Sequence, residues 1–379
     1  SFLIPFESAF DETRVSATPE TVKKFLSFGC KVFLEKGAGE AAGFLDNSYV
    51  DAGAELVERE NNEVKKIVDI VLCVNPPEEK FLSKLKSGCF LVGLLNPYGN
   101  ILLAEILKAQ KISAISLELL PRISRAQSSD ALSSQANIAG YKAVLIAASA
   151  LDRYFPMLMT AAGTIQPSKV VVLGAGVAGL QAIATAKRLG AVVYVSDIRE
   201  AVKEQVESLG ARFIELPKID ETPSESGGYA KQVSDEFLIA QRKELASQLS
   251  EADVAICTAQ VPGKKAPKLI DENMLDDMRP GSVVVDLAVL SGGNCACSKP
   301  GETIIRKGVK IVGASNLPCS IPNHASSLYS RNLLSLLKSM INEGKFVIDN
   351  DDELIAGSLI SKDGVILKSE IIENGGTSS

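Results

Sequence analysis

The sequence predicts an α/β protein with two domains, each built on a parallel sheet, joined by two long helices with a cleft between the domains. A chain of 379 residues, 46% of them hydrophobic, can form two domains with large cores. Short β-branched runs alternate with helical patterns, which is typical of parallel sheets covered on both faces. Within residues 169–200, a strand, a glycine-rich turn, a helix and a second strand follow one another directly.

The glycine-rich turn contains Gly174, Gly176 and Gly179 in G-x-G-x-x-G spacing, directly after the β-branched run Val170–Val172. In such a motif the first glycine permits a tight turn, the second lets a pyrophosphate approach the backbone, and the third lets helix and strand pack closely. The start of the helix offers free N–H groups to phosphates. A strand before the motif and a helix after it favour a dinucleotide-binding Rossmann domain over glycines that serve packing alone.

Asp197 ends the second strand, about twenty residues after the glycines, as this fingerprint requires. A carboxylate there can accept both hydroxyls of an adenosine ribose and would repel a 2′-phosphate, so it favours NAD(H) over NADP(H). Arg199 weakens that preference, because an arginine can bind a 2′-phosphate. The remaining cofactor contacts expected in this domain are Val177, Ala178, Ile198 and, after a later strand, Gln260.

Composition excludes several classes of function. A net charge of −6 without a basic tract argues against a nucleic-acid surface. No apolar run approaches the roughly 18 residues needed to cross a bilayer. The start of the chain does not resemble a signal peptide. Seven scattered cysteines indicate free thiols in a reducing compartment. A single histidine, His324, almost excludes a histidine-based metal site or a Ser-His-Asp triad.

The order of predicted elements gives the domain boundaries. Both domains are expected to be Rossmann-like, the first a discontinuous one formed by residues 1–135 and 340–379 and the second formed by residues 136–339. Ala136–Met159 and Ser326–Asn342 are the two predicted long helices, and Pro156 would bend or end the first of them. Gly357–Ile366 suggests a hairpin with Asp363-Gly364 at its turn.

A polar stretch, Pro121–Gln135, contains two arginines, an aspartate, two glutamines and five serines. From composition alone it is equally well a solvated loop between domains. Its position after a strand end and before the second domain favours a binding role, because α/β proteins bind ligands at the carboxyl ends of their strands.

Several segments together resemble one family, the NAD(H)-binding component of proton-translocating nicotinamide nucleotide transhydrogenase. They are the polar stretch with its continuation to Tyr141, Met159–Thr164, the glycine motif, Lys203–Gly210 and Gly227–Lys231. The resemblance covers nearly the whole chain and is densest from Glu118 to Leu317. It is weaker around Phe6 and Phe10 and in the last 30 residues.

This resemblance implies a function and partners. The family couples hydride transfer from NADH to NADP⁺ with proton movement across a membrane. One component binds NAD(H), a second binds NADP(H), and a membrane component carries the proton. The chain would therefore hold NAD(H), form a homodimer, and act as a soluble domain peripheral to a membrane, facing a bacterial cytoplasm or an organelle interior.

The resemblance also implies the residues around the nicotinamide: Arg122, Gln127, Asp130 and Ser133. Arg122 would contact the carboxamide or pyrophosphate side, Asp130 and Ser133 the carboxamide, and Gln127 the incoming second nicotinamide. A loop bearing Gly228 and Tyr229 would close over bound nucleotide. Neighbouring positions expected to contact the cofactor are Ile123, Ser124, Ser128 and Ser129.

Two alternatives remain. Alanine dehydrogenase shares the architecture but needs acid–base groups in its cleft. Where that family has its lysine, this chain reads Cys73-Val-Asn75, and where it has its histidine, Gly93-Leu-Leu-Asn96. Leu290 stands where it has its aspartate, and only Arg14 survives as a possible carboxylate contact. Direct hydride transfer between two nicotinamides needs orienting groups and exclusion of water, and no general acid or base. A non-catalytic NAD-sensing module would keep the glycines and Asp197 but has no use for the polar stretch.

Overall fold

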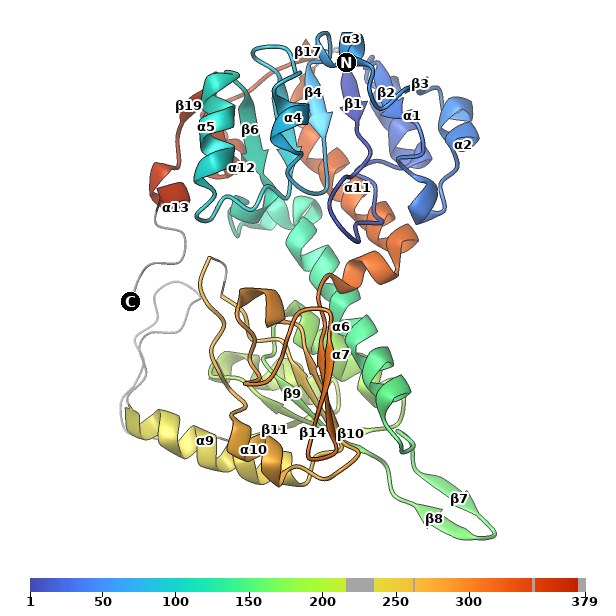
Figure 1. The fold of residues 1–379 in the computed structure, drawn as a ribbon, viewed down its shortest axis with the longest axis vertical. Coiled ribbons are helices and arrows are strands. Elements are labelled where there is room, and N and C mark those ends of the chain that lie inside the picture. Colours follow the sequence, from blue (N-terminus) through green and yellow to red (C-terminus); the bar gives the residue numbers. More distant parts are fainter. Residues whose placement is uncertain (216–234, 262, 343–344, 374–379) are drawn as a thin grey trace. The chain divides into compact units, whose positions relative to one another are not determined.

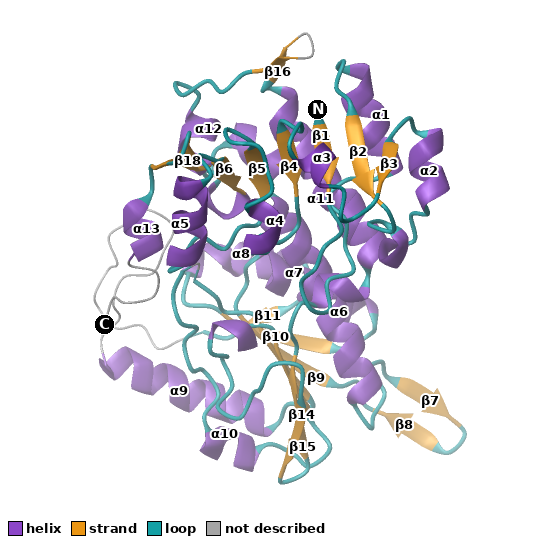
Figure 2. Ribbon diagram, turned by 45° about the horizontal axis from the view of Figure 1, so that its top comes forward, coloured by secondary structure: helices purple, strands orange, loops and turns teal. Residues whose placement is uncertain are grey.

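A computed structural model describes residues 1–215, 235–261, 263–342 and 345–373. The chain forms two compact units (Figure 1). Unit 1 contains Ser1–Gln135 and Pro318–Ser379, and unit 2 contains Ala136–Leu317. Each is an α/β layer structure with helices on both faces of one main sheet (Figure 2), so the predicted fold class of two Rossmann-like domains is confirmed.

The sheet of unit 1 has the strand order β19-β18-β6-β5-β4-β1-β2-β3. Strands β1 to β6 are mutually parallel, and their order 3-2-1-4-5-6 is that of a Rossmann fold. The C-terminal hairpin extends the sheet antiparallel to β6. The strands are β1 (Phe2–Ile4), β2 (Val32–Glu35), β3 (Glu55–Val57), β4 (Ile70–Leu72), β5 (Phe90–Gly93), β6 (Ser113–Ser116), β18 (Leu359–Lys362) and β19 (Val365–Ile366).

Successive side chains of these strands point to opposite faces of the sheet, so the core of unit 1 has two layers. Phe2 and Ile4 of β1 pack in the layer that includes side chains of α1, α11 and α12, whereas Leu3 packs in the layer that includes α5. The helices are α1 (Pro19–Ser27), α2 (Asp46–Asp51), α3 (Asn62–Lys65), α4 (Glu79–Leu82), α5 (Ile101–Ala109), α11 (Pro322–Lys338), α12 (Glu353–Ser358) and α13 (Ser369–Glu373). A small separate ladder pairs β16 (Ile341–Asn342) with β17 (Lys345–Phe346).

Unit 2 repeats this strand order for its first five strands, after which β15 lies between β13 and β14. Its sheet runs β11-β10-β9-β12-β13-β15-β14, in which only β14 is antiparallel to its neighbour. The strands are β9 (Lys169–Leu173), β10 (Val192–Ser196), β11 (Arg212–Phe213), β12 (Val254–Cys257), β13 (Val283–Asp286), β14 (Thr303–Arg306) and β15 (Val309–Gly313). The helices are α6 (Ala131–Ala150), which begins within unit 1, α7 (Val177–Arg188), α8 (Lys203–Ser208), α9 (Asp235–Ser250) and α10 (Glu272–Asp277).

The first long helix is shorter than predicted. Helix α6 ends at Ala150, whereas the sequence pattern extended it to Met159. Phe155 is buried and accepts a backbone hydrogen bond from Ser168, so the chain turns back before Pro156, which cannot continue a helix. The following residues form a hairpin that projects from unit 2 (Figure 1), with strands β7 (Leu158–Thr160) and β8 (Gly163–Ile165).

The second long helix lies in unit 1, although the predicted boundary at residue 340 placed it in the second domain. Tyr329, Leu333 and Leu336 of α11 are fully buried in the core layer of β1, which attaches the helix to the first sheet. The predicted C-terminal hairpin is confirmed: Asp363 and Gly364 both have positive φ, +49° and +81°, as a tight hairpin turn requires. The predicted cleft between the domains stays a prediction.

Candidate dinucleotide site

The glycine motif lies where the strand order of unit 2 reverses. Strand β9 pairs with β10 on one side and with β12 on the other, so the chain leaves β9 at the topological switch point of the sheet. Open α/β sheets bind ligands outside the carboxyl ends of their strands at this point. Gly174 directly follows Leu173, the last residue of β9.

A different physical requirement favours glycine at each of the three positions. Gly174 has a φ of +97°, which side-chain-bearing residues rarely adopt. A Cβ on Gly179 would lie 1.9 Å from the carbonyl oxygen of Gly174, so packing excludes any side chain there. A Cβ on Gly176 would meet no described atom within 4 Å. The middle glycine therefore faces open space, as expected if an outside group approaches the backbone at that position.

Helix α7 presents its N-terminus at the same place. Its N-cap is Gly176, and in the part of the chain that the structure describes no side chain caps the helix. The first N–H groups of this twelve-residue helix are thus directed toward the open space with the positive end of the helix dipole. Helix α6 packs closely beside it: a Cβ on Gly140 would lie 2.0 Å from the carbonyl oxygen of Ala178.

Asp197 is held rigidly beside the glycine loop. Its Oδ2 accepts the N–H of Ala175 at 2.7 Å and Nη2 of Arg199 at 2.9 Å. Its Oδ1 accepts the N–H of Arg199 at 2.8 Å and Nε of Arg199 at 3.0 Å. Burial alone would raise the pKa of Asp197, but the Arg199 side chain and the two backbone N–H groups outweigh it and hold that pKa below its ordinary value. The carboxylate is charged at neutral pH.

Sequence reasoning missed two residues at this place: Thr258 bonds the glycine loop, and Asn294 bonds Ala259, the neighbour of Thr258. Thr258, after β12, has its Oγ1 2.9 Å from the carbonyl oxygen of Gly174 and 3.1 Å from that of Leu173. Asn294 is fully buried, and its amide bonds both the N–H and the carbonyl of Ala259. In the sequence, the signal for Thr258 was a polar residue after a buried strand, and the signal for Asn294 was a polar residue after a glycine pair.

The other predicted contacts in unit 2 fall into two groups. Val177 and Ile198 are 40% and 46% exposed, and they flank the glycine loop and Asp197 in sequence. Gln260 donates through Nε2 to the carbonyl of Leu287 at 2.8 Å, which holds the segment after β12 against β13. Gly228 and Tyr229 lie outside the described residues.

The polar stretch of unit 1 forms a 3₁₀ helix, η3 (Ser124–Ser129), followed by α6. Asp130 caps α6: its carboxylate accepts the N–H of Ser133 at 2.9 Å and the Ser133 hydroxyl at 2.6 Å. The structure therefore brings together the two residues predicted to hold the carboxamide. Arg122 and Gln127 are exposed at the same surface stretch, as is Ser124.

Hydrogen bonds to α11 hold the polar stretch in place. The Ser128 hydroxyl lies 2.6 Å from that of Ser335, and Asn332 bonds both the Ser128 carbonyl and the Ser134 hydroxyl. Ile123 packs against the core and Ser129 is buried. These side chains support the stretch, whereas Arg122, Ser124 and Gln127 remain accessible to a ligand.

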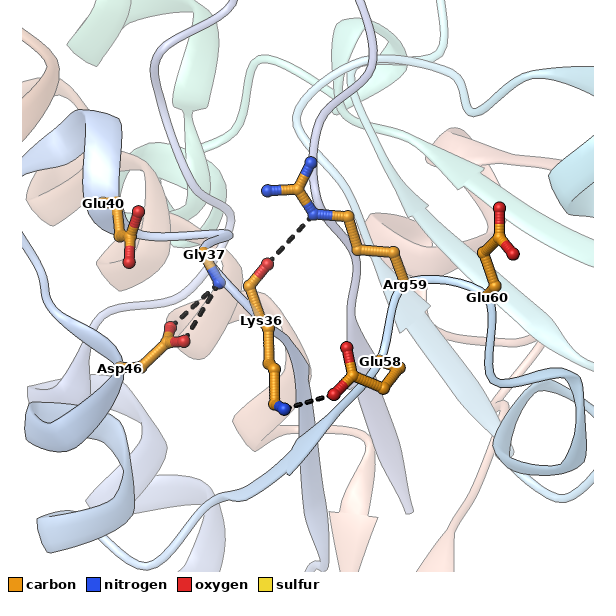
Figure 3. Close-up of a pocket in the computed structure, with 7 residues that line it drawn as sticks. All are labelled: Lys36, Gly37, Glu40, Asp46, Glu58, Arg59 and Glu60. Atoms are coloured by element: carbon orange, nitrogen blue, oxygen red, sulfur yellow. Dashed lines mark hydrogen bonds and ion pairs between the residues drawn. The ribbon is translucent and has the colours of Figure 1, made fainter.

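A hollow of about 550 Å³ in unit 1 is a separate feature (Figure 3). Its lining has four carboxylates, of Glu40, Asp46, Glu58 and Glu60, and two cations, of Lys36 and Arg59. Asp46 accepts the Gly37 N–H, Lys36 pairs with Glu58, and Arg59 donates to the Lys36 carbonyl. The excess of negative charge disfavours an anionic dinucleotide, and no predicted site residue lines this hollow.

Three residues weighed for the alanine dehydrogenase alternative carry no acid–base group, and two of them bond neighbouring carboxylates. Asn75 donates to Glu12 at 2.7 Å, the Asn96 N–H donates to Glu118 at 2.7 Å, and Leu290 is 67% exposed. Arg14 is 5% exposed; its Nε and Nη2 bond Glu12 and its Nη1 bonds Gln135. The carboxylate that Arg14 contacts is thus one from its own chain.

Neither a membrane-spanning helix nor a metal cluster is found in the described ranges. Among the helices there, none is long and apolar enough to span a membrane. Over the same ranges, histidine, cysteine, aspartate and glutamate side chains form no group of three that could hold a metal ion.

Comparison with known proteins gives matches along nearly the whole chain. Residues 3–139 match the family described as "Alanine dehydrogenase/PNT, N-terminal domain", and residues 143–369 match its C-terminal domain. An NAD(P) transhydrogenase alpha-subunit polypeptide of Rhodospirillum rubrum is 45% identical over 372 residues, 96% of this chain and 97% of that protein.

Two solved structures resemble the fold closely. The transhydrogenase from Sinorhizobium meliloti is 41% identical, with a TM-score of 0.87 over 97% of this chain and 99% of that one. An L-alanine dehydrogenase is 27% identical, with a TM-score of 0.81 over 98% of each chain. Sequence identity is therefore clearly higher to these transhydrogenases than to the alanine dehydrogenase.

Proposed function

This chain belongs to the alanine dehydrogenase/PNT family, and from that premise we propose that it is the NAD(H)-binding half of a proton-translocating transhydrogenase. It would exchange hydride between its own NAD(H) and NADP(H) held by a partner component. The coupled movement of protons would belong to a membrane component.

The observation that carries the proposal is the arrangement at the end of β9. Gly176 faces open space, α7 directs uncapped N–H groups into that space, and the charged carboxylate of Asp197 lies beside the loop. The backbone around Gly176 would hold the pyrophosphate and Asp197 the adenosine ribose. Val177 and Ile198 offer apolar surface to the adenine. The residues present thus fit a dinucleotide.

The polar stretch of unit 1 would serve the nicotinamide end. Bound NADH supplies the hydride, and the protein moves no proton in that step. Asp130 and Ser133, fixed to each other at the start of α6, would orient the carboxamide. Exposed Arg122 and Gln127 would contact the cofactor and the incoming second nicotinamide. Such orienting contacts act by holding two rings at reactive distance.

Alanine dehydrogenase is the weaker alternative. Asn75 and Asn96 cannot exchange protons near neutral pH, and Arg14 is engaged by Glu12 and Gln135. A non-catalytic NAD-sensing module would use the same nucleotide site. The accessible polar residues Arg122 and Gln127 on a stretch anchored by α11 favour the transhydrogenase.

We propose that the expected homodimer forms through the hairpin of β7 and β8. Strand β12 is fully buried in the sheet centre and offers no surface to a second copy. Hairpin β7–β8 instead exposes Met157, Met159 and Ile165, at 54%, 75% and 44%. This arm would pack on a second copy of the chain, and a Met159→Asp variant should then sediment as a monomer.

Hydride transfer tests the proposed function directly. NADH is mixed with an NADP⁺ analogue of distinct absorbance, with and without a purified NADP(H)-binding component. Turnover only in the mixture supports a half-transhydrogenase. NADH binding without transfer in the mixture supports the sensing module, and turnover of alanine or pyruvate supports the dehydrogenase.

A further inference from the structure

We propose that Arg199 is an internal competitor for the ribose site: its side chain occupies the acceptor positions of Asp197 that the adenosine hydroxyls need. It thereby sets the affinity for NAD(H) and the tolerance of a 2′-phosphate. The inference rests on the proposed function, because it assigns Asp197 to the ribose.

The acceptor capacity of Asp197 is full in this structure. An ionised carboxylate offers about four lone-pair positions, two on each oxygen. Oδ1 accepts the backbone N–H and Nε of Arg199, and Oδ2 accepts the N–H of Ala175 and Nη2 of Arg199. Four donors thus fill the four positions, and none is left for a hydroxyl hydrogen.

The four bonds differ in how easily they are released. The N–H groups of Ala175 and Arg199 belong to the backbone of the glycine loop and of the turn after β10, so they stay in place. The Arg199 side chain is 41% exposed and can rotate into solvent, whereas the Asp197 side chain is only 6% exposed. Rotation of Arg199 frees one acceptor position on each oxygen, which matches the two hydroxyl donors of a vicinal diol.

Rotation also leaves the guanidinium beside the ribose. There it would attract a 2′-phosphate, which the carboxylate repels. Arg199 therefore acts in opposite directions on the two cofactors: its removal should strengthen binding of the diol and weaken binding of the 2′-phosphate. This opposition separates competition at Asp197 from a general loss of positive charge, which would weaken the binding of every anionic nucleotide.

The variant is Arg199→Ala, and the matched control is Lys203→Ala. Lys203 carries the same charge four residues later, but it pairs with Glu215 at 2.6 Å and does not contact Asp197. Probes are NADH, NADPH and adenosine, with 2′-deoxyadenosine as the adenosine lacking one hydroxyl. Adenosine has no phosphate, so long-range attraction to phosphates does not affect its binding. Dissociation constants come from NADH fluorescence and from competition against it.

Surface ion pairs contribute up to about 1 kcal/mol, which is about fivefold in a dissociation constant, so Arg199→Ala should tighten adenosine and NADH binding roughly two- to fivefold. The gain for 2′-deoxyadenosine should be smaller, and NADPH should bind more weakly. Arg199→Lys keeps the charge but cannot bond both carboxylate oxygens of Asp197 at once as Nε and Nη2 of Arg199 do. Its adenosine affinity should fall between those of the wild type and Arg199→Ala. In an Asp197→Ala background, Arg199→Ala should no longer tighten adenosine.

Other outcomes overturn the inference. Unchanged or weaker adenosine binding in Arg199→Ala, with a wild-type melting curve, would show that Arg199 does not compete. If Arg199→Ala and Lys203→Ala changed the dissociation constants equally, the loss of one positive charge would explain both results and no competition at Asp197 would be needed. If Arg199→Ala does not fold, Arg199→Lys and its adenosine affinity decide the same question. Wild-type protein that binds no NADH would instead overturn the proposed function itself.

Discussion

The hydroxyl of Thr258 lies 2.9 Å from the carbonyl oxygen of Gly174, and this contact joins the ends of β12 and β9 across the switch point of the second sheet. The two residues are 84 positions apart in the chain. The contact fixes the first turn of the glycine loop from a strand that contributes nothing to the motif itself.

Thr258→Val tests that contact, because valine keeps the shape and removes the hydroxyl. We expect a loss of about 1 kcal/mol in the free energy of unfolding, typical of one hydrogen bond. NADH binding should weaken a fewfold, because the glycine loop loses one support. Chemical denaturation and fluorescence titration measure the two effects. Thr303→Val, on the exposed first position of edge strand β14, is the control and should change neither.

Gly176 and Gly179 form a matched pair for alanine substitution. Gly179→Ala should destabilise the fold by about 3 kcal/mol or more, because the new Cβ would lie 1.9 Å from a backbone oxygen. Gly176→Ala should leave the melting temperature unchanged, since its Cβ meets no described atom, yet weaken NADH binding roughly tenfold by holding the pyrophosphate off the backbone. Equal stability of the two variants would contradict the packing role of Gly179.

Gln127→Asn should slow hydride transfer more than it weakens NADH binding. The side chain is exposed on η3 and is expected to face the second nicotinamide, which is present only in the mixed complex. Rates in the two-component assay are compared with dissociation constants for the isolated chain. Gln205→Asn, on the exposed surface of α8, is the control. Equal losses in rate and binding would remove Gln127 from the reacting complex.

Glu7 should make stability fall as pH rises through the weakly acidic range. Burial raises the pKa of Glu7 to about 7 from an ordinary 4.5, although the N–H groups of Val74 and Asn75 lower it. The folded state holds the proton of Glu7 more tightly than the unfolded chain does. Protonated Glu7 therefore adds to the free energy of unfolding, and this addition is complete below pH 4.5 and lost by pH 7. The loss is about 3 kcal/mol at most.

Glu7→Gln should remove that part of the pH dependence. Denaturation midpoints at pH 5 and pH 8 measure it: the wild type should lose more stability between them than the variant. Glu12 does not interfere, because Arg14 overcomes the effect of burial and lowers the pKa of Glu12 to about 2, outside this window. Parallel curves for the two proteins would show that Glu7 is ionised throughout.

The amino-acid sequence by itself determined the local units. The strand, glycine turn, helix and second strand from 169 to 200 follow from residue spacing, because a turn with positive φ and a helix start depend on neighbouring residues. The hairpin turn at Asp363-Gly364 follows in the same way. The Rossmann-like class of both units needed only the alternation of such elements and the rule that parallel strands require crossover connections.

Only the tertiary structure showed which residues that are distant in the sequence contact one another. Burial of Tyr329, Leu333 and Leu336 assigned α11 to unit 1, because apolar periodicity shows that a helix is covered but not by which sheet. Thr258 bonds the glycine loop and Asn294 bonds Ala259 through contacts between neighbouring strand ends, which residue type alone does not indicate. Arg199 and Asp197 are two residues apart, yet only the fold shows that all four acceptor positions of the carboxylate are filled, because one of the donors is the N–H of Ala175 in a different loop.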